Sequence, residues 1–421
     1  MFKETLMNYQ TKEDAMKDNH HHSGVGIDAM GLSFPRCYLR LADLAAVRGV
    51  DAAKYEKGLG CEKMAIAHPS EDTVTLAAAA ADAALRDGNV APDEIGLLIV
   101  GTETAVDHAK PVASYVQGLL NISPSCRVYE TKHACYGGTA GVLSACEWIA
   151  SGAHRGRKAL VIASDIARYP LGSPGEPTQG AGAAAMIISA EPRLLDIDFG
   201  RTGTWSRDVH DFWRPLPAAD ALVDGALSLE CYMEALRNAY GEYAREAQAS
   251  ERHFDALLFH TPFVRMAEKG HKALLTCSRG DIGNDELAAS LERRVRPSLR
   301  LAAQVGNAYS ASLWLGLASA IEYGGYPTGA RVGFYSYGSG FCGEFFSGTL
   351  HRSTPGLVPS LQAIEDRQAI DVATYEAWLA ERLGPGPHEP IDGSTEPFVY
   401  VGTQRDRRCY QSAPLSAVQV R

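Results

Sequence analysis

Four polar residues stand where apolar runs of the sequence end: Glu103, Cys135, His260 and Asn307. A thiol, a carboxylate, an imidazole and an amide are the groups that nucleophilic catalysis combines. The thiol can carry an acyl group, and the carboxylate can move a proton. The imidazole and the amide can hold or polarise a carbonyl oxygen. Together these residue types predict a site of nucleophilic catalysis built around the cysteine.

Each of the four residues also has a simpler interpretation. A cysteine is among the residue types most often buried as core filler. Glu103 and Asn307 could cap helices, and His260 could be an ordinary residue at the end of a strand. The small residues of 137–141 favour a nucleophile, because they admit a substrate to the sulfur of Cys135. Helix amides at that point would lower the pKa of the thiol, and a dry site would raise the pKa of Glu103.

The segments that must position these residues occur twice in the chain. Each set consists of an apolar strand, a helix and a second apolar strand, and 29 positions separate both Cys135 from Ser164 and Asn307 from Ser336. This order is typical of helix-covered sheets, in which functional groups gather at the carboxyl ends of strands. We therefore expect a duplicated α/β fold. The strands are expected at 94–104, 158–167, 254–263 and 330–340, and the second helix at 306–325.

The same pattern predicts the domain organisation. A polar N-terminal extension covers residues 1–23 and includes three consecutive histidines. The first half is expected at 24–192 and the second at 193–421, with an insertion or lid near 202–240. A Pro- and Gly-rich piece at 384–397 is typical of a surface loop.

Composition excludes several classes of function. The chain has 421 residues, 46% hydrophobic and 21% charged, which is typical of globular proteins. Its net charge of −10 argues against nucleic acid or an anionic membrane as the main partner. Basic segments at 154–158, 293–300 and 405–408 are either solvated faces or landing sites for an anionic carrier.

The remaining motif searches point to an enzyme without a metal or cofactor. No apolar run is long enough to span a membrane, and no phosphate-binding or dinucleotide-binding glycine motif is present. The nine cysteines and thirteen histidines lack ligand spacing. Scattered unpaired cysteines and the lack of an apolar leader predict a cytoplasmic protein.

Seven stretches of the chain resemble the 3-hydroxy-3-methylglutaryl-CoA synthases of the thiolase superfamily, and they occur in that family's order. The resemblance covers residues 24–347 and implies a thiolase-like fold, with two similar βαβ-rich halves, mixed sheets and buried helices, and a homodimer. The stretches are 100–122, 130–141, 164–186, 223–232, 259–269, 306–313 and 335–340.

The resemblance also implies roles for individual residues. Cys135 would be acylated by an acetyl thioester, Glu103 would take a proton from the acetyl methyl group, and His260 would hold a β-keto thioester. Asn307 and Ser339 would hold and polarise acyl groups. For these two residues and for four further implied positions, residue type alone favours an ordinary role in a loop or a helix cap. The four further positions are Asp165, Tyr169 and Asp211, which would line the pocket, and Lys269, which would face the pantetheine arm.

Two versions of this chemistry fit the resemblance. In one, an acyl carrier protein presents the β-ketoacyl thioester, and the enzyme adds a β-branch to a polyketide. In the other, a mevalonate-pathway enzyme uses CoA thioesters. Lys132 and the basic segments at 293–300 and 405–408 favour the carrier-protein version.

Two other classes fit less well. A condensing enzyme that decarboxylates malonyl thioesters would use His260 and Asn307, but the surroundings of Glu103 do not match that class. A catalytically inactive scaffold of the same fold would need none of Glu103, Cys135 and His260.

Overall fold

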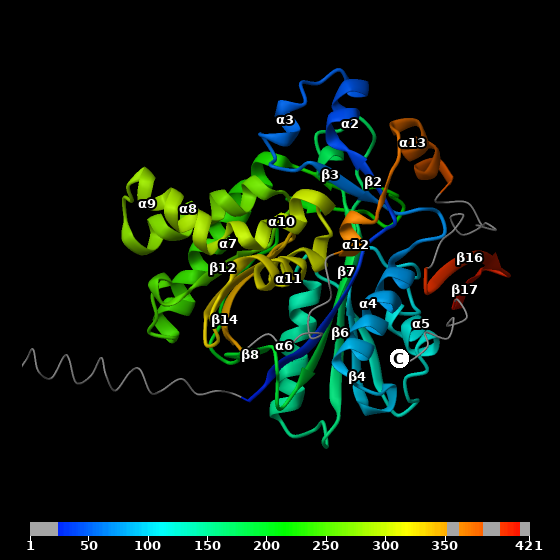
Figure 1. Ribbon diagram of the computed structural model, residues 1–421, viewed down its shortest axis with the longest axis horizontal. Helices are drawn as coiled ribbons and strands as arrows, with labels where there is room; N and C mark the ends of the chain where they lie inside the picture. Colours follow the sequence, from blue (N-terminus) through cyan, green and yellow to red (C-terminus); the bar gives the residue numbers. More distant parts are fainter. Residues whose placement is uncertain (1–23, 352–361, 382–395, 413–421) are drawn as a thin grey trace, which may run out of the picture.

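The computed structural model describes residues 24–351, 362–381 and 396–412, and it is a mixed α/β fold with buried helices (Figure 1). The expected N-terminal extension at 1–23, with its histidines, lies outside the described residues. So do residues 384–395 of the expected surface loop.

The strands and helices follow one another along both halves. The strands are β1 (Gly26–Ser33), β2 (Cys37–Arg40), β3 (Lys63–Ile66), β4 (Ile95–Gly101), β5 (Arg127–Thr131), β6 (Lys158–Ile166), β7 (Ala181–Ser189), β8 (Leu195–Ile197), β9 (Gly203–Ser206), β10 (Phe212–Trp213), β11 (Leu222–Val223), β12 (Ala256–Phe259), β13 (Arg331–Gly338), β14 (Cys342–Leu350), β15 (Gln368–Ala369), β16 (Phe398–Gln404) and β17 (Arg407–Ser412). The α-helices are α2 (Leu41–Arg48), α3 (Ala53–Glu56), α4 (Thr73–Gly88), α5 (Val112–Leu119), α6 (Gly137–Ala150), α7 (Gly225–Glu246), α8 (Val264–Arg279), α9 (Asn284–Arg294), α10 (Arg296–Val305), α11 (Ser312–Gly324), α12 (Gln362–Glu365) and α13 (Val372–Glu381).

The duplication is visible in the ten-stranded sheet. In the first half, β1 pairs antiparallel with β7, β7 antiparallel with β6, and β6 parallel with β4. In the second half, β8 pairs antiparallel with β14, β14 antiparallel with β13, and β13 parallel with β12. The two series meet where β1 pairs with β8. The same order and directions in both halves confirm the expected duplicated fold.

Glycines allow α6 to lie close to the sheet, as the small residues of its sequence predict. A Cβ atom at Gly138 would lie 2.7 Å from the Cβ of Ala163, and one at Gly141 would lie 3.0 Å from a methyl carbon of Val161. The helix also reaches the other half, because Ser336 on β13 donates a hydrogen bond to Thr139 at 2.8 Å. Helix α6 therefore lies between the halves, with its N-terminus at their junction (Figure 1).

The equivalent helix of the second half begins later than the sequence suggests. The expected start was residue 306, whereas α11 begins at Ser312 after a single 3₁₀ turn. Gly306 and Tyr309 have φ angles of 80° and 43°, in the left-handed region that interrupts a helix. Asn307 therefore lies in a loop ahead of the helix. Its side-chain oxygen accepts hydrogen bonds from the Tyr309 amide and the Ser312 hydroxyl.

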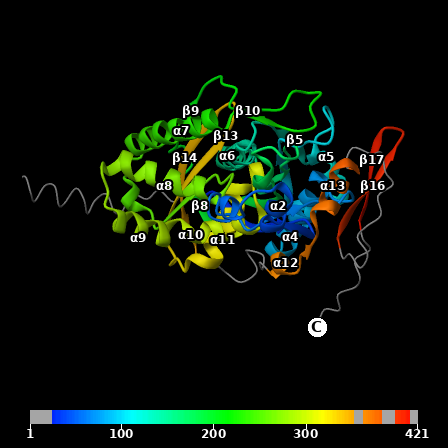
Figure 2. The same cartoon turned by 90° about the horizontal axis from the view of Figure 1, so that it is seen from above.

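The expected insertion near 202–240 forms a hairpin followed by a long helix. Strands β10 and β11 pair with each other, β9 joins β14, and α7 follows directly. At the other side of the molecule, β16 and β17 form a hairpin of their own (Figure 2). No helix within the described ranges is long and apolar enough to cross a bilayer.

Candidate active site

A cavity of about 660 Å³ opens where strands of both halves end. Its walls come from the loops after β6, β12 and β13, from the β10–β11 hairpin and from α8. Six of the residues expected to function line this cavity: Cys135, Tyr169, His260, Lys269, Asn307 and Ser339.

Glu103 and Cys135 form the reactive pair of the site. Strand β4 ends two residues before Glu103, and α6 begins two residues after Cys135. The thiol donates a hydrogen bond to the Glu103 carboxyl, with 3.3 Å between Sγ and Oε1. A Cβ atom at Gly101 would lie 2.4 Å from the amide nitrogen of Gly138, so glycine at this strand end lets the helix start approach the base. The two groups are therefore close enough to exchange a proton.

The surroundings of this pair raise the pKa of both groups, which corrects the expectation of a lowered pKa for the Cys135 thiol. Burial and, to a smaller extent, the charge of Asp165 raise the pKa of Glu103 to about 8, as predicted for a dry site. The thiol was expected to have a lowered pKa, but burial and the neighbouring Glu103 raise the pKa of Cys135 well above its usual value. The sulfur bonds to a carboxyl rather than to the helix amides, so the helix does not offset this cost. The raised pKa favours the protonated thiol of Cys135, and Glu103 is placed to accept its proton.

His260 supplies a neutral imidazole to the opposite wall. Its backbone is fixed from both sides, because its amide donates to Tyr335 at 2.7 Å and its carbonyl accepts from the Tyr232 hydroxyl at 2.9 Å. Burial lowers the pKa of the ring to about 3. Nδ1 has no hydrogen-bond partner among the described residues. A neutral ring with an unused nitrogen suits a hydrogen bond to a substrate rather than storage of a proton.

Asn307 and an aromatic cluster complete the inner wall. The Asn307 oxygen already accepts two hydrogen bonds, which leaves its NH₂ group as the end available to a carbonyl oxygen. Phe212 packs edge-on against Tyr169 and Tyr309, with ring centroids 6.2 and 5.7 Å away. The Tyr309 hydroxyl is buried and interacts with the Tyr169 hydroxyl. The sequence reasoning missed Tyr309 and Phe212, although Tyr309 stands only two positions after Asn307.

Asp165 was expected on the pocket wall, but the structure places it behind the wall. It is fully buried and accepts hydrogen bonds from hydroxyls of Thr102, Thr104 and Ser310 and from the backbone amide of Glu103. The carboxylate thus ties the loop that carries the base to the turn that follows Asn307. Asp165 positions the reactive groups and raises the pKa of Glu103 through its charge.

Asp211 was also expected to line the pocket, and it too is buried behind the wall. It accepts hydrogen bonds from the Tyr337 hydroxyl at 2.7 Å and the Gly340 amide at 2.8 Å. Asp211 therefore anchors the β10–β11 hairpin to the turn after β13. The Gly340 amide is therefore used within the protein and is not available to bind an oxyanion.

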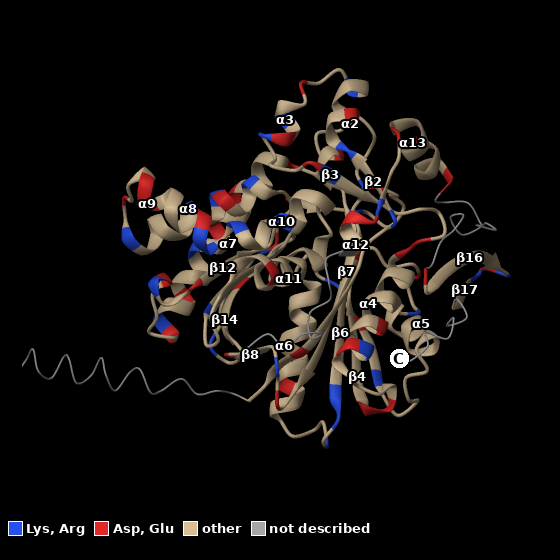
Figure 3. Cartoon of the chain, viewed as in Figure 1, with Lys and Arg blue, Asp and Glu red and all other residues tan. Residues whose placement is uncertain are grey.

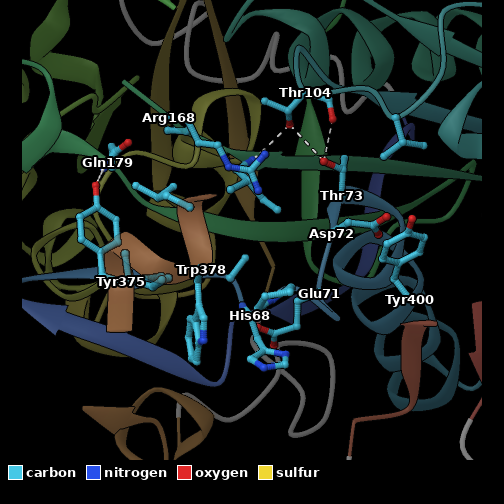
Figure 4. A pocket seen from close by; sticks show the side chains of 18 of the residues that line it. His68, Glu71, Asp72, Thr73, Thr104, Arg168, Gln179, Tyr375, Trp378 and Tyr400 are labelled. Carbon is cyan, nitrogen blue, oxygen red and sulfur yellow. Dashed lines mark hydrogen bonds between the residues drawn. The ribbon is translucent and has the colours of Figure 1, made fainter. Parts of the chain in front are cut away.

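A smaller cavity of about 230 Å³ is lined by Thr104, the residue after Glu103, and by residues of several other segments (Figure 4). Thr73 donates a hydrogen bond to the Thr104 carbonyl at 2.8 Å, and Gln179 donates to the Tyr375 hydroxyl at 2.6 Å. Glu71 lies here as well, and burial raises its pKa to about 8. The lining contains no cysteine. Over the described ranges, no three His, Cys, Asp or Glu side chains are grouped to hold a metal ion. The larger cavity is therefore the candidate active site.

Comparison with known proteins assigns the family. The model of the hydroxymethylglutaryl-coenzyme A synthase N-terminal region matches residues 21–192, and that of the C-terminal region matches 195–284 and 284–377. The chain belongs to the hydroxymethylglutaryl-CoA synthase family. It is thus an enzyme of the acyltransferase type with a thiolase-like fold, as the sequence resemblance implied.

Relatives of both substrate types are similar to the chain. A hydroxymethylglutaryl-CoA synthase of Enterococcus faecalis is 38% identical over 366 residues, 85% of this chain and 92% of the relative. The polyketide biosynthesis 3-hydroxy-3-methylglutaryl-ACP synthase PksG of Bacillus subtilis is 36% identical over 336 residues, 77% of this chain and 79% of the relative.

Solved structures show the same division. MvaS in complex with 3-hydroxy-3-methylglutaryl coenzyme A has a TM-score of 0.87 at 42% identity, covering 92% of this chain and 99% of its own. The curacin pathway HMG synthase in complex with holo donor-ACP has a TM-score of 0.86 at 33% identity, covering 92% and 100%.

Proposed function

We propose that this enzyme condenses an acetyl group bound to Cys135 with a β-ketoacyl thioester on an acyl carrier protein and releases a 3-hydroxy-3-methylglutaryl-type product. The hydrogen bond between Cys135 and Glu103 supports this proposal most directly, because it joins a nucleophile that lines the cavity to a base that lies behind the lining. The reaction needs no metal or cofactor beyond its thioester substrates.

The first step loads the enzyme. The Cys135 sulfur attacks the donor carbonyl while its proton passes to Glu103, and the donor thiol leaves with that proton. The acetyl group is then a thioester of Cys135, and Glu103 is again a carboxylate. A thioester makes the α-methyl group acidic enough for a carboxylate base in a dry site.

The second step forms the carbon–carbon bond. Glu103 takes a methyl proton, and the resulting enolate carbon attacks the β-ketone of the acceptor. The ketone oxygen becomes an alkoxide and takes the proton back from Glu103. We propose that His260 and the Asn307 amide hold the acceptor and acyl oxygens by hydrogen bonds. Water then hydrolyses the Cys135 thioester and releases a carboxylate product.

The entrance of the cavity supports a carrier protein as the partner. Lys269 on α8 is exposed and lines the cavity, and Lys272 is exposed one turn further along the same helix. Figure 3 shows basic segments among acidic ones on α8 and α9 at this edge of the molecule. Cations at the mouth of a pantetheine channel suit an acidic carrier. PksG and the curacin enzyme, both named for polyketide pathways, are related to this chain.

Each of two basic segments noted in the sequence has one arginine that is paired inside the chain. Arg294 is buried against Glu251 at 2.9 Å, and Arg408 pairs with Asp72 at 2.7 Å. Both charges are neutralised inside the chain. The α8 lysines are therefore the better candidates for contact with a carrier.

A second candidate is the mevalonate-type reaction with CoA thioesters. The 38% identity to the Enterococcus enzyme and the 42% identity to MvaS favour it. The chemistry at Cys135 and Glu103 is the same in both cases, and only the carrier of the acyl groups differs.

A crossed substrate experiment separates the two candidates. Acetyl donors and β-ketoacyl acceptors are supplied on carrier protein, on CoA and on pantetheine, and product and acyl-Cys135 are followed by intact mass. The proposal predicts kcat/KM at least tenfold higher with the carrier protein than with CoA. Efficient turnover with CoA alone would contradict it and support the second candidate.

Charge reversal at the entrance sharpens this test. Lys269→Glu and Lys272→Glu should raise KM for carrier-protein substrates about tenfold, the equivalent of about 1.4 kcal/mol. Turnover of pantetheine thioesters should stay within about twofold in Lys272→Glu, because Lys272 lies outside the lining of the cavity. The matched control is Arg155→Glu, since this exposed residue follows the far end of α6. Equal losses on all three carriers would show that the lysines do not contact the carrier.

The proposal includes a homodimer, which light scattering of the purified chain tests directly. A monomer at micromolar concentration would overturn this part without affecting the chemistry.

A further inference from the structure

Arg214 connects the β10–β11 hairpin to the loop that carries the base. It follows β10 directly, and its guanidinium donates a hydrogen bond to the backbone carbonyl of Glu103. The two residues are 111 positions apart in sequence, so the contact exists only in the folded protein. Neither the sequence motifs nor the reaction steps described above assign a role to this arginine.

The hairpin that carries Arg214 is itself held in place. Asp211, three residues earlier, is buried and fixed by Tyr337 and Gly340, and Phe212 packs against Tyr169 and Tyr309. The arginine therefore extends from a fixed segment, although its own side chain is exposed. Its position relative to Glu103 follows from this anchoring.

Among the residues that the structure describes, the other side chains shown to act on the pKa of Glu103 are Asp165 and Cys135. Asp165 lies behind it on β6, Cys135 lies ahead of it beside α6, and the hydroxyls of Tyr169 and Tyr309 lie nearby. Arg214 supplies the positive charge that acts on Glu103 and lowers its pKa against the effects of burial and Asp165. A cation in that place favours the carboxylate, which is the form a general base requires.

We propose that Arg214 is a positioning residue for Glu103, which fixes the peptide of the base by a hydrogen bond and stabilises the negative charge of the Glu103–Cys135 pair. This inference rests on the proposed function, in which Glu103 is the base. It adds that the hairpin contributes to reactivity and does not only cover the cavity.

The experiment compares three replacements of Arg214 with wild type. Arg214→Met removes the hydrogen bond and the charge, Arg214→Gln keeps a donor without the charge, and Arg214→Lys keeps the charge. Arg207→Met is the matched control, because Arg207 is an arginine of the same insertion that pairs with Glu234 at 2.8 Å. Thermal melts and circular dichroism establish that each variant is folded.

The first readout needs no substrate. The rate at which iodoacetamide alkylates Cys135 is measured from pH 6 to pH 10, since only the thiolate reacts. In Arg214→Met and Arg214→Gln, the midpoint of the alkylation profile should shift to higher pH by about 0.5 to 1 pH unit. The shift is modest because the arginine is exposed. The profile of Arg214→Lys should lie close to that of wild type, and the profile of Arg207→Met should match wild type. Superimposable profiles for wild type and Arg214→Met would overturn the inference.

The second readout is the pH dependence of kcat for condensation. The ascending limb should shift in the same direction in Arg214→Met, with a loss of about three- to tenfold at pH 7 that Arg214→Lys largely restores. If Arg214→Lys falls as far as Arg214→Met while both are folded, the charge has no role and the inference fails. If Glu103→Gln keeps full activity, the proposed function fails, and the alkylation profile still decides the effect of Arg214.

Discussion

The two halves of the molecule have the same strand order but supply different chemistry to the site. After β4 the first half places Glu103, and after the equivalent β12 the second half places His260. Ahead of α6 stands Cys135, and ahead of α11 stands Asn307. The first half provides a carboxyl and a thiol, which exchange protons and form covalent bonds. The second half provides an imidazole and an amide that stay neutral.

Burial has opposite consequences in the two halves. Burial is the main cause that raises the pKa of Glu103 to about 8, close to the neutral pH at which a general base must be able to ionise. It lowers the pKa of His260 to about 3, so the imidazole does not titrate near neutral pH. Removal from water therefore has two results: it makes the carboxyl group of the first half a useful base, and it keeps the imidazole of the second half neutral. The duplicated fold thus places the groups that exchange protons and form covalent bonds in one half, and the groups that bind the substrate by hydrogen bonds in the other.

The largest loss of activity is expected from a substitution in the first half, which supplies Glu103 and Cys135. Glu103→Gln keeps the size of the side chain but removes the base, and condensation should fall about a thousandfold. Acetylation of Cys135 should lose much less, because thiolate also forms in alkaline buffer. Single-turnover assays of product and of acyl-enzyme measure the two steps separately. Glu147→Gln, on the exposed face of α6, is the control, and equal losses in both steps would argue against a specific role in condensation.

In the second half, His260 should tolerate replacement by another neutral side chain that donates a hydrogen bond. His260→Ala should lower kcat/KM for the β-keto acceptor about a hundredfold, whereas His260→Asn, which still donates a hydrogen bond, should lose about tenfold. Steady-state kinetics with varied acceptor measures this difference. Acetylation of Cys135 should be within about twofold of wild type in both variants. If His260→Asn is as impaired as His260→Ala, His260 does more than hold the acceptor by a hydrogen bond.

The pH dependence tests the same division. Glu103 must be ionised to act, so the condensation rate should rise with pH through the pKa of about 8. A limb near the ordinary pKa of histidine should be absent, because His260 is neutral across that range. Stopped-time assays in overlapping buffers measure the profile. An added limb near neutral pH that disappears in His260→Asn would show that the second half does titrate.

The smallest expected effect concerns stability. The folded protein holds the Glu103 proton up to about pH 8, whereas the unfolded chain loses it near the usual glutamate pKa. The contribution of Glu103 to the free energy of unfolding is therefore fully present at low pH and is lost as the pH rises to about 8. Glu103→Gln should stabilise the protein at pH 8 by about 1–2 kcal/mol after allowance for access of water through the cavity. Urea unfolding at pH 5 and pH 8 measures this difference, and a variant less stable than wild type at pH 8 would contradict it.

Sequence reasoning predicted the parts of the site that local patterns define. Cys135, Glu103, His260 and Asn307 follow strand ends or precede helices, and apolar runs mark those points. The same patterns predicted the duplicated sheet. The late start of α11 was missed, because the left-handed turn at Tyr309 has no clear signal in the sequence.

The remainder of the site depends on contacts between distant segments. Asp165 and Asp211 were placed on the pocket wall, but hydrogen bonds from other elements draw both behind it. The thiol pKa was misjudged because burial and the carboxyl opposite decide it, and neither can be read from residues near Cys135. Arg214 reaches Glu103 across 111 positions of sequence. Such pairings are set by tertiary packing rather than by local pattern.

Detection of the acyl-enzyme tests the central claim most directly. The protein is mixed with the acetyl donor alone, quenched in acid, digested and analysed by mass spectrometry, alongside Cys135→Ala. The account predicts one acetyl group on Cys135 in wild type, its disappearance when the β-keto acceptor is added, and no product from Cys135→Ala. Product formation by Cys135→Ala, or an acetyl group on Cys135 that persists while product accumulates, would contradict it.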